Sequence, residues 1–364
     1  MGEIENLWQG MQTAREKKSS GTNGELTRLY LDKYPVVEES LNRFVSKQGG
    51  LRPELLDPLT YAVMTLGGKR ARPILVYISY GLIAGTLSNN SSFLDRAAII
   101  PELPHKGSLV EDDIDDNSTT RGGKLSVFKN FGNTDEEGLR IAKDTYQLLY
   151  RAPGIILPEL DLPGTLTKDI LKQYREDAVL ARSGQAMEAE WGVDARHIEA
   201  ADISIYFDIT RRKCAAFGYA MYLGGALAGA TPKQQAALRS IADFSSVPFQ
   251  LMDDLEDLSP DKPEFGGDIT ESKPILPLRF ALAVNKGTEN GKILREIVDS
   301  RTADPELLRQ AVGIMEETEA LDYTRFMAET WAGYALDRLS EVFPDSDARR
   351  AMTELINFCV TREI

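Results

Sequence analysis

Two short acidic clusters constrain this chain more than any other feature of its sequence. Both follow the pattern DDxxD, and their members are Asp112, Asp113, Asp116, Asp253, Asp254 and Asp257. Residues three and four apart share one face of a helix, so each cluster can direct two or three carboxylates towards one point. A fold that sets these two faces opposite each other would enclose a strongly acidic cavity.

The setting of the clusters indicates a metal site. An isolated acidic run is usually a solvated helix surface, but both runs here follow apolar stretches, at 107–110 and 247–252. Neighbouring carboxylates raise each other's pKa unless cations offset their charge. Magnesium prefers hard oxygen ligands and completes its shell with water and phosphate oxygens. Because His105 and His197 are the only histidines, the pattern predicts a magnesium–diphosphate site rather than a zinc site.

A basic segment upstream supplies the complementary charge. The run GGKRARP at 67–73 places Lys69, Arg70 and Arg72 directly after two glycines. Lysine charge and arginine forks suit the binding of a diphosphate, although glycine and basic residues are also typical of a helix C-terminus with solvated charges. The position of this run before the first acidic cluster favours diphosphate binding.

Hydrophobic periodicity predicts helices in the first half of the chain. Apolar residues from Val37 to Val45 mark one helical face, which predicts a helix that begins at Pro35 and ends at Gly49-Gly50. The most apolar stretch, 73–87, is too short to cross a bilayer and predicts a buried helix.

The second half continues the helical pattern. An apolar-rich stretch at 203–230 is broken only by Arg211-Arg212-Lys213, and an apolar stripe runs through 352–359. No β-alternating series is present, and 42% of the 364 residues are hydrophobic, which is enough for a large core. We expect one all-α domain over 25–364, preceded by an extension or linker at 1–24.

Composition excludes several partners and compartments. The 42 basic against 56 acidic residues give a formal charge of −14, so nucleic acid is not an expected partner. Cys214 and Cys359 are too few for a disulfide framework, so a reducing cytoplasm is the expected compartment. We expect no targeting segment and no transmembrane segment.

The order of the motifs resembles that of the trans-isoprenyl diphosphate synthases of the polyprenyl synthetase family, such as geranylgeranyl and farnesyl diphosphate synthases. The resemblance spans nearly the whole chain after residue 25. Its segments are GGKRARP at 67–73, ExxH at Glu102 and His105, SLVEDDIDDNS at 108–118, Gly184-Gln185, Lys213, FQLMDDLED at 249–257 and GGDITESKPILP at 266–277.

The resemblance implies an isoprenoid synthase fold, in which a helical bundle surrounds a deep apolar cavity, and a homodimer. The implied enzyme is a magnesium-dependent prenyltransferase that joins an allylic diphosphate to isopentenyl diphosphate. The resemblance assigns magnesium to Asp112, Asp113, Asp116 and Asp253, with Asp254 and Asp257 in support. It assigns isopentenyl diphosphate to Lys69, Arg72 and His105, and the allylic diphosphate to Arg121, Lys213 and Lys273. Gln250 and the backbone near Lys213 would stabilise a carbocation.

The sequence departs from the family pattern after the first acidic cluster. Where relatives carry two arginines, this chain has Arg121-Gly122-Gly123, so the second guanidinium is missing. Lys106 and Lys124 are the candidate replacements. The departure leaves two alternatives open: a class I terpene synthase that ionises one prenyl diphosphate, and a regulatory subunit of a prenyl synthase.

Product length in this family depends on the residues just before the first acidic cluster. Gly107 and Ser108 are small, and a bulky ring at either position would block elongation. Two small residues predict an open tunnel, and geranylgeranyl diphosphate is the expected product.

Overall fold

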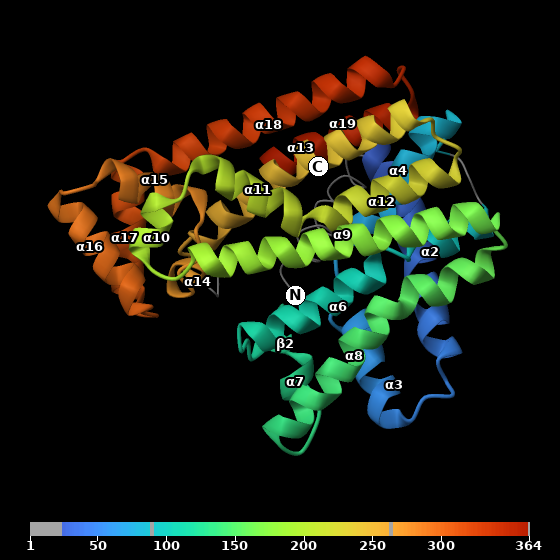
Figure 1. Ribbon diagram of the computed structural model, residues 1–364, viewed down its shortest axis with the longest axis horizontal. Helices are drawn as coiled ribbons and strands as arrows, with labels where there is room; N and C mark the ends of the chain where they lie inside the picture. The colour runs from blue at the N-terminus through green and yellow to red at the C-terminus, as the bar shows by residue number, and fades with distance from the viewer. Residues whose placement is uncertain (1–23, 88–90, 262–264, 363–364) are drawn as a thin grey trace, which may run out of the picture.

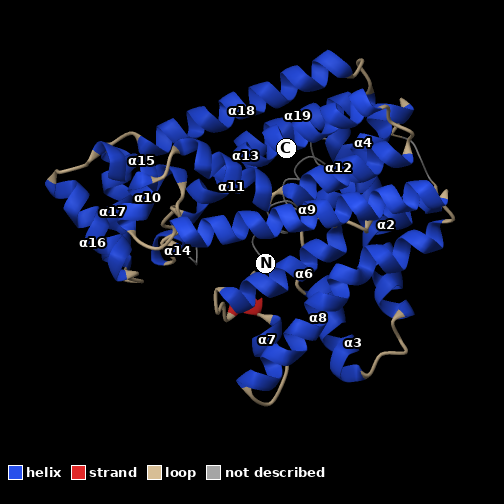
Figure 2. Ribbon diagram, viewed as in Figure 1, coloured by secondary structure: helices blue, strands red, loops and turns tan. Residues whose placement is uncertain are grey.

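The computed structural model describes residues 24–87, 91–261 and 265–362, and these residues are almost entirely helical (Figures 1 and 2). The predicted extension at 1–24 lies outside the described residues except for Gly24. The first half contains α2 (Glu25–Lys47), α3 (Pro53–Thr60), the π-helix η2 (Tyr61–Thr65), α4 (Ala71–Ala84), α5 (Ser92–Ala98), α6 (Glu102–Asp115), β1 (Thr120–Arg121), β2 (Lys124–Leu125), α7 (Val127–Asn130), α8 (Asp135–Ile156), the 3-10 helix η3 (Leu157–Leu160) and α9 (Gly164–Trp191).

The second half of the described chain is helical as well. Its elements are α10 (Ala195–Ala200), α11 (Ile203–Lys213), α12 (Ala215–Leu227), α13 (Pro232–Asp257), α14 (Gly267–Thr270), α15 (Leu276–Val284), α16 (Glu289–Ser300), α17 (Pro305–Glu317), α18 (Ala320–Val342) and α19 (Asp347–Thr361). In Figure 1, α18 runs alongside α13, and α14 to α17 form a lobe at one end of the molecule.

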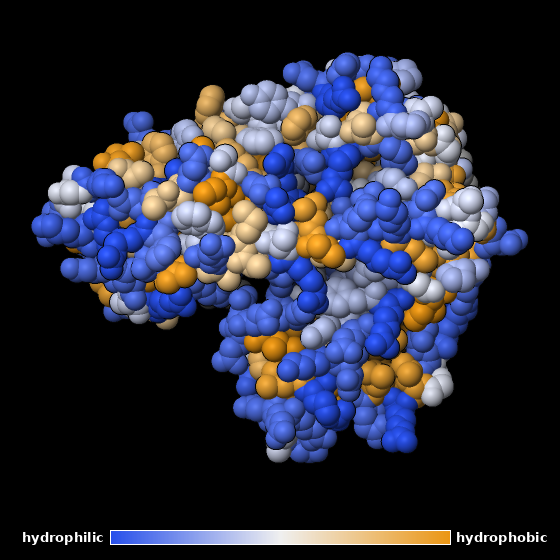
Figure 3. Space-filling model, viewed as in Figure 1, coloured by the Kyte–Doolittle hydropathy of each residue, from blue (hydrophilic) through white to orange (hydrophobic). Residues whose placement is uncertain are grey.

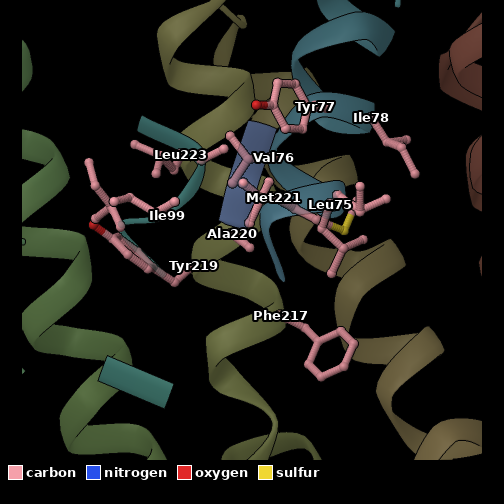
Figure 4. Packing of buried hydrophobic residues seen from close by; sticks show 14 of the residues in the cluster. Leu75, Val76, Tyr77, Ile78, Ile99, Phe217, Tyr219, Ala220, Met221 and Leu223 are labelled. Atoms are coloured by element: carbon pink, nitrogen blue, oxygen red, sulfur yellow. The ribbon is translucent and has the colours of Figure 1, made fainter. Parts of the chain in front are cut away.

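Helices α4 and α12 pack against each other in the main core. Figure 4 shows Val76 and Tyr77 of α4 beside Ala220, Met221 and Leu223 of α12, and all of these side chains are buried. The predicted buried helix at 73–87 is therefore confirmed over most of its length. The break that the basic run predicted is also present, because Cys214 separates α11 from α12.

Helix α2 begins ten residues earlier than the sequence predicted, at Glu25, and Pro35 lies inside it. The reason is a contact from the other end of the chain. The Glu354 carboxylate of α19 accepts hydrogen bonds from the backbone N–H groups of Glu25 and Leu26, at 3.0 and 2.8 Å. A helix leaves its first N–H groups without partners, so this carboxylate acts as a cap that the local sequence does not reveal.

Replacing Glu354 with alanine is expected to lower the free energy of unfolding by about 1–2 kcal/mol, the usual cost of losing a helix cap. Urea denaturation followed by circular dichroism measures this loss. The matched control is Glu341→Ala, because the Glu341–Arg338 ion pair is largely exposed and contributes little. Equal stability of the two variants would contradict the capping role.

One hairpin interrupts the helices, which the sequence did not predict. Strands β1 and β2 pair antiparallel with Thr120 opposite Leu125, and Gly122 and Gly123 form the two-residue turn with φ angles of 57° and 74°. Such a turn needs positive φ at both central residues, which glycine adopts without strain. An arginine at 122 would carry that strain, so the hairpin gives a physical reason for the missing guanidinium.

Within the described residues, no helix combines the length and the apolar character needed to span a membrane.

Candidate active site

The two acidic clusters lie at the C-terminal ends of two helices. Asp112 and Asp113 are on the last turn of α6, and Asp116 is its C-cap residue. Asp253 and Asp254 are on the last turns of α13, which ends at Asp257. The negative end of a helix dipole disfavours carboxylates, so both clusters need nearby cations.

The start of α6 accommodates its prolines without a kink. Pro101 is the N-cap residue and Pro104 is the third residue of the helix. The first N–H groups of a helix have no partner within it, so a proline at these positions removes no intrahelical hydrogen bond.

Neighbouring polar side chains hold the first cluster. Gln185 of α9 donates a hydrogen bond from Nε2 to Asp112 Oδ1. Arg121 of β1 donates to Asp113 Oδ1 from Nε at 2.8 Å, and its Nη2 lies 2.7 Å from the same oxygen. The hairpin therefore places Arg121 against the acidic end of α6.

The second cluster has different neighbours. Asp253 Oδ1 lies 2.5 Å from Nη2 of Arg362, which follows α19. Asp254 accepts hydrogen bonds from the Tyr206 hydroxyl at 2.6 Å and from Gln250 Nε2 at 2.8 Å.

Asp257 contacts the segment that follows α13. Its Oδ2 accepts a hydrogen bond from the backbone N–H of Asp268, at 3.0 Å. Asp257 thereby fixes the start of α14 beside the second cluster.

Burial raises the pKa of the cluster carboxylates. It raises the pKa of Asp112 and of Asp253 to about 6, of Asp257 to about 7 and of Asp254 to about 8. The negative charge of Asp268 is a further cause for Asp254 and Asp257. Carboxylates in this state favour a bound cation, because its charge offsets both the burial and the mutual repulsion.

Two lysines lie within electrostatic reach of the acidic clusters. The charge of Lys213 acts on the pKa of Asp112, and the charge of Asp116 acts on that of Lys273. Lys213 Nζ lies 2.6 Å from Glu188 of α9, and Lys273 Nζ lies 3.2 Å from Asp268. A small cavity of about 60 Å³ lies between them; its lining includes Glu188, Lys213, Gln250, Asp254, Asp268 and Lys273.

A close helix contact positions Lys213. A Cβ atom at Gly184 of α9 would lie 2.7 Å from the backbone nitrogen of Lys213 and 2.8 Å from Cβ of Arg212. Glycine at 184 therefore lets α9 and α11 approach closely enough for the Lys213–Glu188 ion pair to form.

The basic segment divides into structural and site residues. Arg70 is 1% exposed and pairs with Glu38 at 2.6 Å and Glu102 at 3.0 Å, so the expectation that it helps to capture a diphosphate is wrong. Arg72 stacks over the Phe217 ring at 5.0 Å, and its buried Nε has no hydrogen-bond partner within the described region. Lys69 acts electrostatically on Asp253, which brings this segment to the second cluster.

His105 lies among cations. Burial lowers its pKa well below the usual value, and the charges of Arg72, Lys106 and Arg121 lower it further. The imidazole is therefore neutral at physiological pH and can donate one N–H to a ligand.

Four contacts were missed by reasoning from the sequence. Arg362, Tyr206, Glu188 and Asp268 all touch predicted site residues. Glu188 lies one helical turn after Gln185 and Asp268 lies five residues before Lys273, so spacing could have indicated these two. Arg362 and Tyr206 approach Asp253 and Asp254 through tertiary packing, which leaves no local signal.

The carboxylates do not converge into a finished metal cluster. Across 24–87, 91–261 and 265–362, no three His, Cys, Asp or Glu side chains are placed to hold one ion together. The donor set nevertheless fits magnesium, since it offers several hard carboxylate oxygens whose burial and mutual repulsion raise their pKa.

The surface of the molecule is hollowed on the face shown in Figure 3. Figure 3 shows a hollow between the lobe of α14 to α17 and the part of the molecule that carries α6 and the hairpin.

The helical fold carries two acidic helix ends with lysines in electrostatic reach, which suits an enzyme that acts on diphosphates, and comparison with known proteins identifies the family. The model of the polyprenyl synthetase family matches residues 52–315, so the chain belongs to that family. It is therefore an isoprenyl diphosphate synthase, an enzyme of the prenyltransferase class in isoprenoid biosynthesis.

Similar proteins cover nearly the whole chain. A geranylgeranyl diphosphate synthase of Sulfolobus acidocaldarius is 29% identical, covering 92% of this chain and 99% of its own. An all-trans-nonaprenyl-diphosphate synthase (geranyl-diphosphate specific) of Rhodobacter capsulatus is 25% identical, covering 90% and 96%. The crystal structure of a Corynebacterium glutamicum geranylgeranyl pyrophosphate synthase, complexed with isoprenyl diphosphate and magnesium, has a TM-score of 0.78 at 24% identity, covering 91% and 99%. The predicted all-α isoprenoid synthase fold is confirmed.

Proposed function

We propose that this enzyme condenses an allylic diphosphate with isopentenyl diphosphate and releases an all-trans prenyl diphosphate one isoprene unit longer. The observation that carries the proposal is the placement of Lys213 and Lys273 within electrostatic reach of the first acidic cluster, beside a cavity that Asp254 of the second cluster also lines. Two lysines that line a cavity with Asp254, and that lie within electrostatic reach of Asp112 and Asp116, suit a diphosphate that binds through metal ions.

Magnesium would be held by carboxylates of both clusters, with Asp112, Asp113, Asp116 and Asp253 as the principal ligands and Asp254 and Asp257 in support. When bound, magnesium neutralises the charge that develops on the departing pyrophosphate. The Arg121, Lys213 and Lys273 side chains would bind the same diphosphate, and their fixed positive charges stabilise it as a leaving group.

Dipoles of the protein then stabilise the allylic carbocation. Gln250 donates its amide N–H to Asp254, so its carbonyl oxygen is the end that can face a cation. Isopentenyl diphosphate would bind to Lys69, Arg72 and His105, and its double bond attacks the carbocation. Loss of a proton to the retained pyrophosphate restores an allylic diphosphate, and no protein nucleophile is needed.

Incubation with isopentenyl diphosphate, magnesium and one allylic diphosphate at a time tests this function. The expected result is pyrophosphate release and a longer prenyl diphosphate. Hydrocarbon or alcohol products from the allylic diphosphate alone would instead support the terpene synthase alternative. No turnover with any allylic substrate would support the regulatory subunit.

We propose geranylgeranyl diphosphate as the product, made within a single domain over 25–364 that forms a homodimer. Similar proteins make geranylgeranyl and nonaprenyl diphosphates, so they do not decide chain length. Mass spectrometry of the product tests the chain length, and light scattering of the purified protein tests the homodimer.

Residue 108 is the better place to test tunnel depth. A Cβ atom at Gly107 would lie 3.2 Å from Leu149 Cβ and from the Tyr146 backbone oxygen of α8, so Gly107→Phe would disrupt packing. Ser108 lies one helical turn before Asp112 and thus on the same face of α6. Ser108→Phe is expected to shift the product to a shorter chain, and Ser108→Ala, the matched control, to leave it unchanged. An unaltered product in Ser108→Phe would argue against depth control at this position.

A further inference from the structure

Lys106 is a buried cation that the chemistry above does not use. It lies on α6 beside His105 and is 4% exposed. Its Nζ donates a hydrogen bond to the backbone oxygen of Gly67, in the turn that precedes Lys69. An ammonium group carries three N–H donors, and within the described residues Gly67 O is the acceptor found for Nζ. Lys106 therefore has donors to offer a ligand.

The charges around Lys106 are mostly positive. Arg70, Arg72 and Arg121 lie near enough to lower its pKa, and Glu102 is the neighbouring anion that raises it. Burial is the largest cause of a pKa of about 8.

The nearby anions are already engaged by other cations. Glu102 pairs with Arg70 at 3.0 Å, and Asp113 pairs with Arg121 at 2.7 Å. Arg72 contributes a buried Nε without a hydrogen-bond partner inside the described ranges. A buried positive charge is costly unless an anion compensates it, so Lys106 and Arg72 together indicate an anionic ligand between α6 and the segment 67–73.

Lys124 is the other lysine that could replace the missing second arginine, and it is placed differently. Lys124 is exposed on β2, and its Nζ contacts the backbone oxygen of Thr65. By contrast, a Cβ atom at Gly68 would lie 3.2 Å from Lys106 Nζ, so the bare backbone of this turn leaves room for the Lys106 ammonium. Lys106 thus contacts the turn that precedes Lys69 and lies within electrostatic reach of Arg72, whereas Lys124 is exposed.

We propose that Lys106 binds the diphosphate of isopentenyl diphosphate. Its ammonium group replaces the second guanidinium, which is missing because glycine occupies position 122. This role rests on the proposed function, because it assigns one more residue to the same substrate. It adds a fourth donor side chain to Lys69, Arg72 and His105, and like His105 it lies on α6.

The test is the binding of isopentenyl diphosphate in the absence of an allylic substrate, measured by isothermal titration calorimetry. Lys106→Met is expected to raise the dissociation constant about tenfold or more, the usual effect of losing a hydrogen bond to a charged group. In steady-state assays the KM for isopentenyl diphosphate should rise by a similar factor, with the KM for the allylic diphosphate within twofold. Lys124→Met is the matched control and should change neither value by more than twofold.

Lys106→Arg keeps the positive charge, so it serves as a second test if Lys106→Met does not fold. It should bind isopentenyl diphosphate within about threefold of the wild type. Unchanged binding in a folded Lys106→Met variant, or an equal loss for both substrates, would overturn the role of Lys106, as would a tenfold loss in a folded Lys106→Arg. If the wild type neither binds isopentenyl diphosphate nor elongates any allylic diphosphate, the proposed function itself fails.

Discussion

Replacing Asp112 or Asp253 with alanine is expected to lower kcat about 100- to 1,000-fold, which corresponds to roughly 2.7–4 kcal/mol of lost transition-state stabilisation. The reason is that each carboxylate would hold an ion that neutralises the leaving pyrophosphate. Removing either one weakens the interaction that grows as the carbon–oxygen bond breaks. Pyrophosphate release at saturating magnesium and substrate measures the effect.

A control variant in the same acidic run distinguishes the loss of a metal ligand from the loss of one negative charge. Asp115 lies between the ligands of the first cluster but is exposed on α6. Asp115→Ala should keep kcat within about threefold, while thermal unfolding of all three variants stays close to that of the wild type. Equal kcat values for Asp112→Ala, Asp253→Ala and Asp115→Ala would show that neither acidic cluster has a specific role in catalysis.

Arg70→Met is expected to lower the free energy of unfolding by about 3–5 kcal/mol. Arg70 is buried, pairs with Glu38 and Glu102, and donates a hydrogen bond to the Val63 backbone oxygen at 2.9 Å. Without it, the Glu102 carboxylate stays buried and loses the cation with which it forms an ion pair. Urea denaturation gives the stability difference.

The matched control is Arg43→Met, which removes an exposed i,i+4 ion pair with Glu39 and should cost less than about 1 kcal/mol. Adding Glu102→Met to Arg70→Met should recover part of the loss, since the unbalanced carboxylate is then gone. A small loss in Arg70→Met, or no recovery in the double variant, would show that the pair carries little stability.

The sequence predicts elements that depend on local pattern. The apolar runs that become α4 and α12 are visible because these helices are buried nearly all round, and α19 is visible because burial on one side of a helix imposes a 3.6-residue period. The acidic clusters are equally visible, because their spacing alone brings carboxylates to one face. The break between α11 and α12 follows from a basic run that has no place in a core.

The sequence does not predict what tertiary contacts decide. Pro35 is a favourable first-turn residue, yet α2 begins at Glu25 because a carboxylate from α19 caps it. Arg70 resembles its neighbours Lys69 and Arg72 in sequence, but the chain turns it towards Glu38 and Glu102. Arg362 reaches Asp253 only because α19 packs along α13. Each contact joins segments that are distant in the chain.

The position of Arg362 bears on how the protein should be handled. Its guanidinium lies over the Phe249 ring at 4.7 Å, within reach of a carboxylate proposed to hold magnesium. An affinity tag fused after residue 364 would follow that arginine closely in sequence and so could disturb the proposed metal site. Kinetic work should therefore use protein that carries no tag after Arg362, or protein from which such a tag has been cleaved.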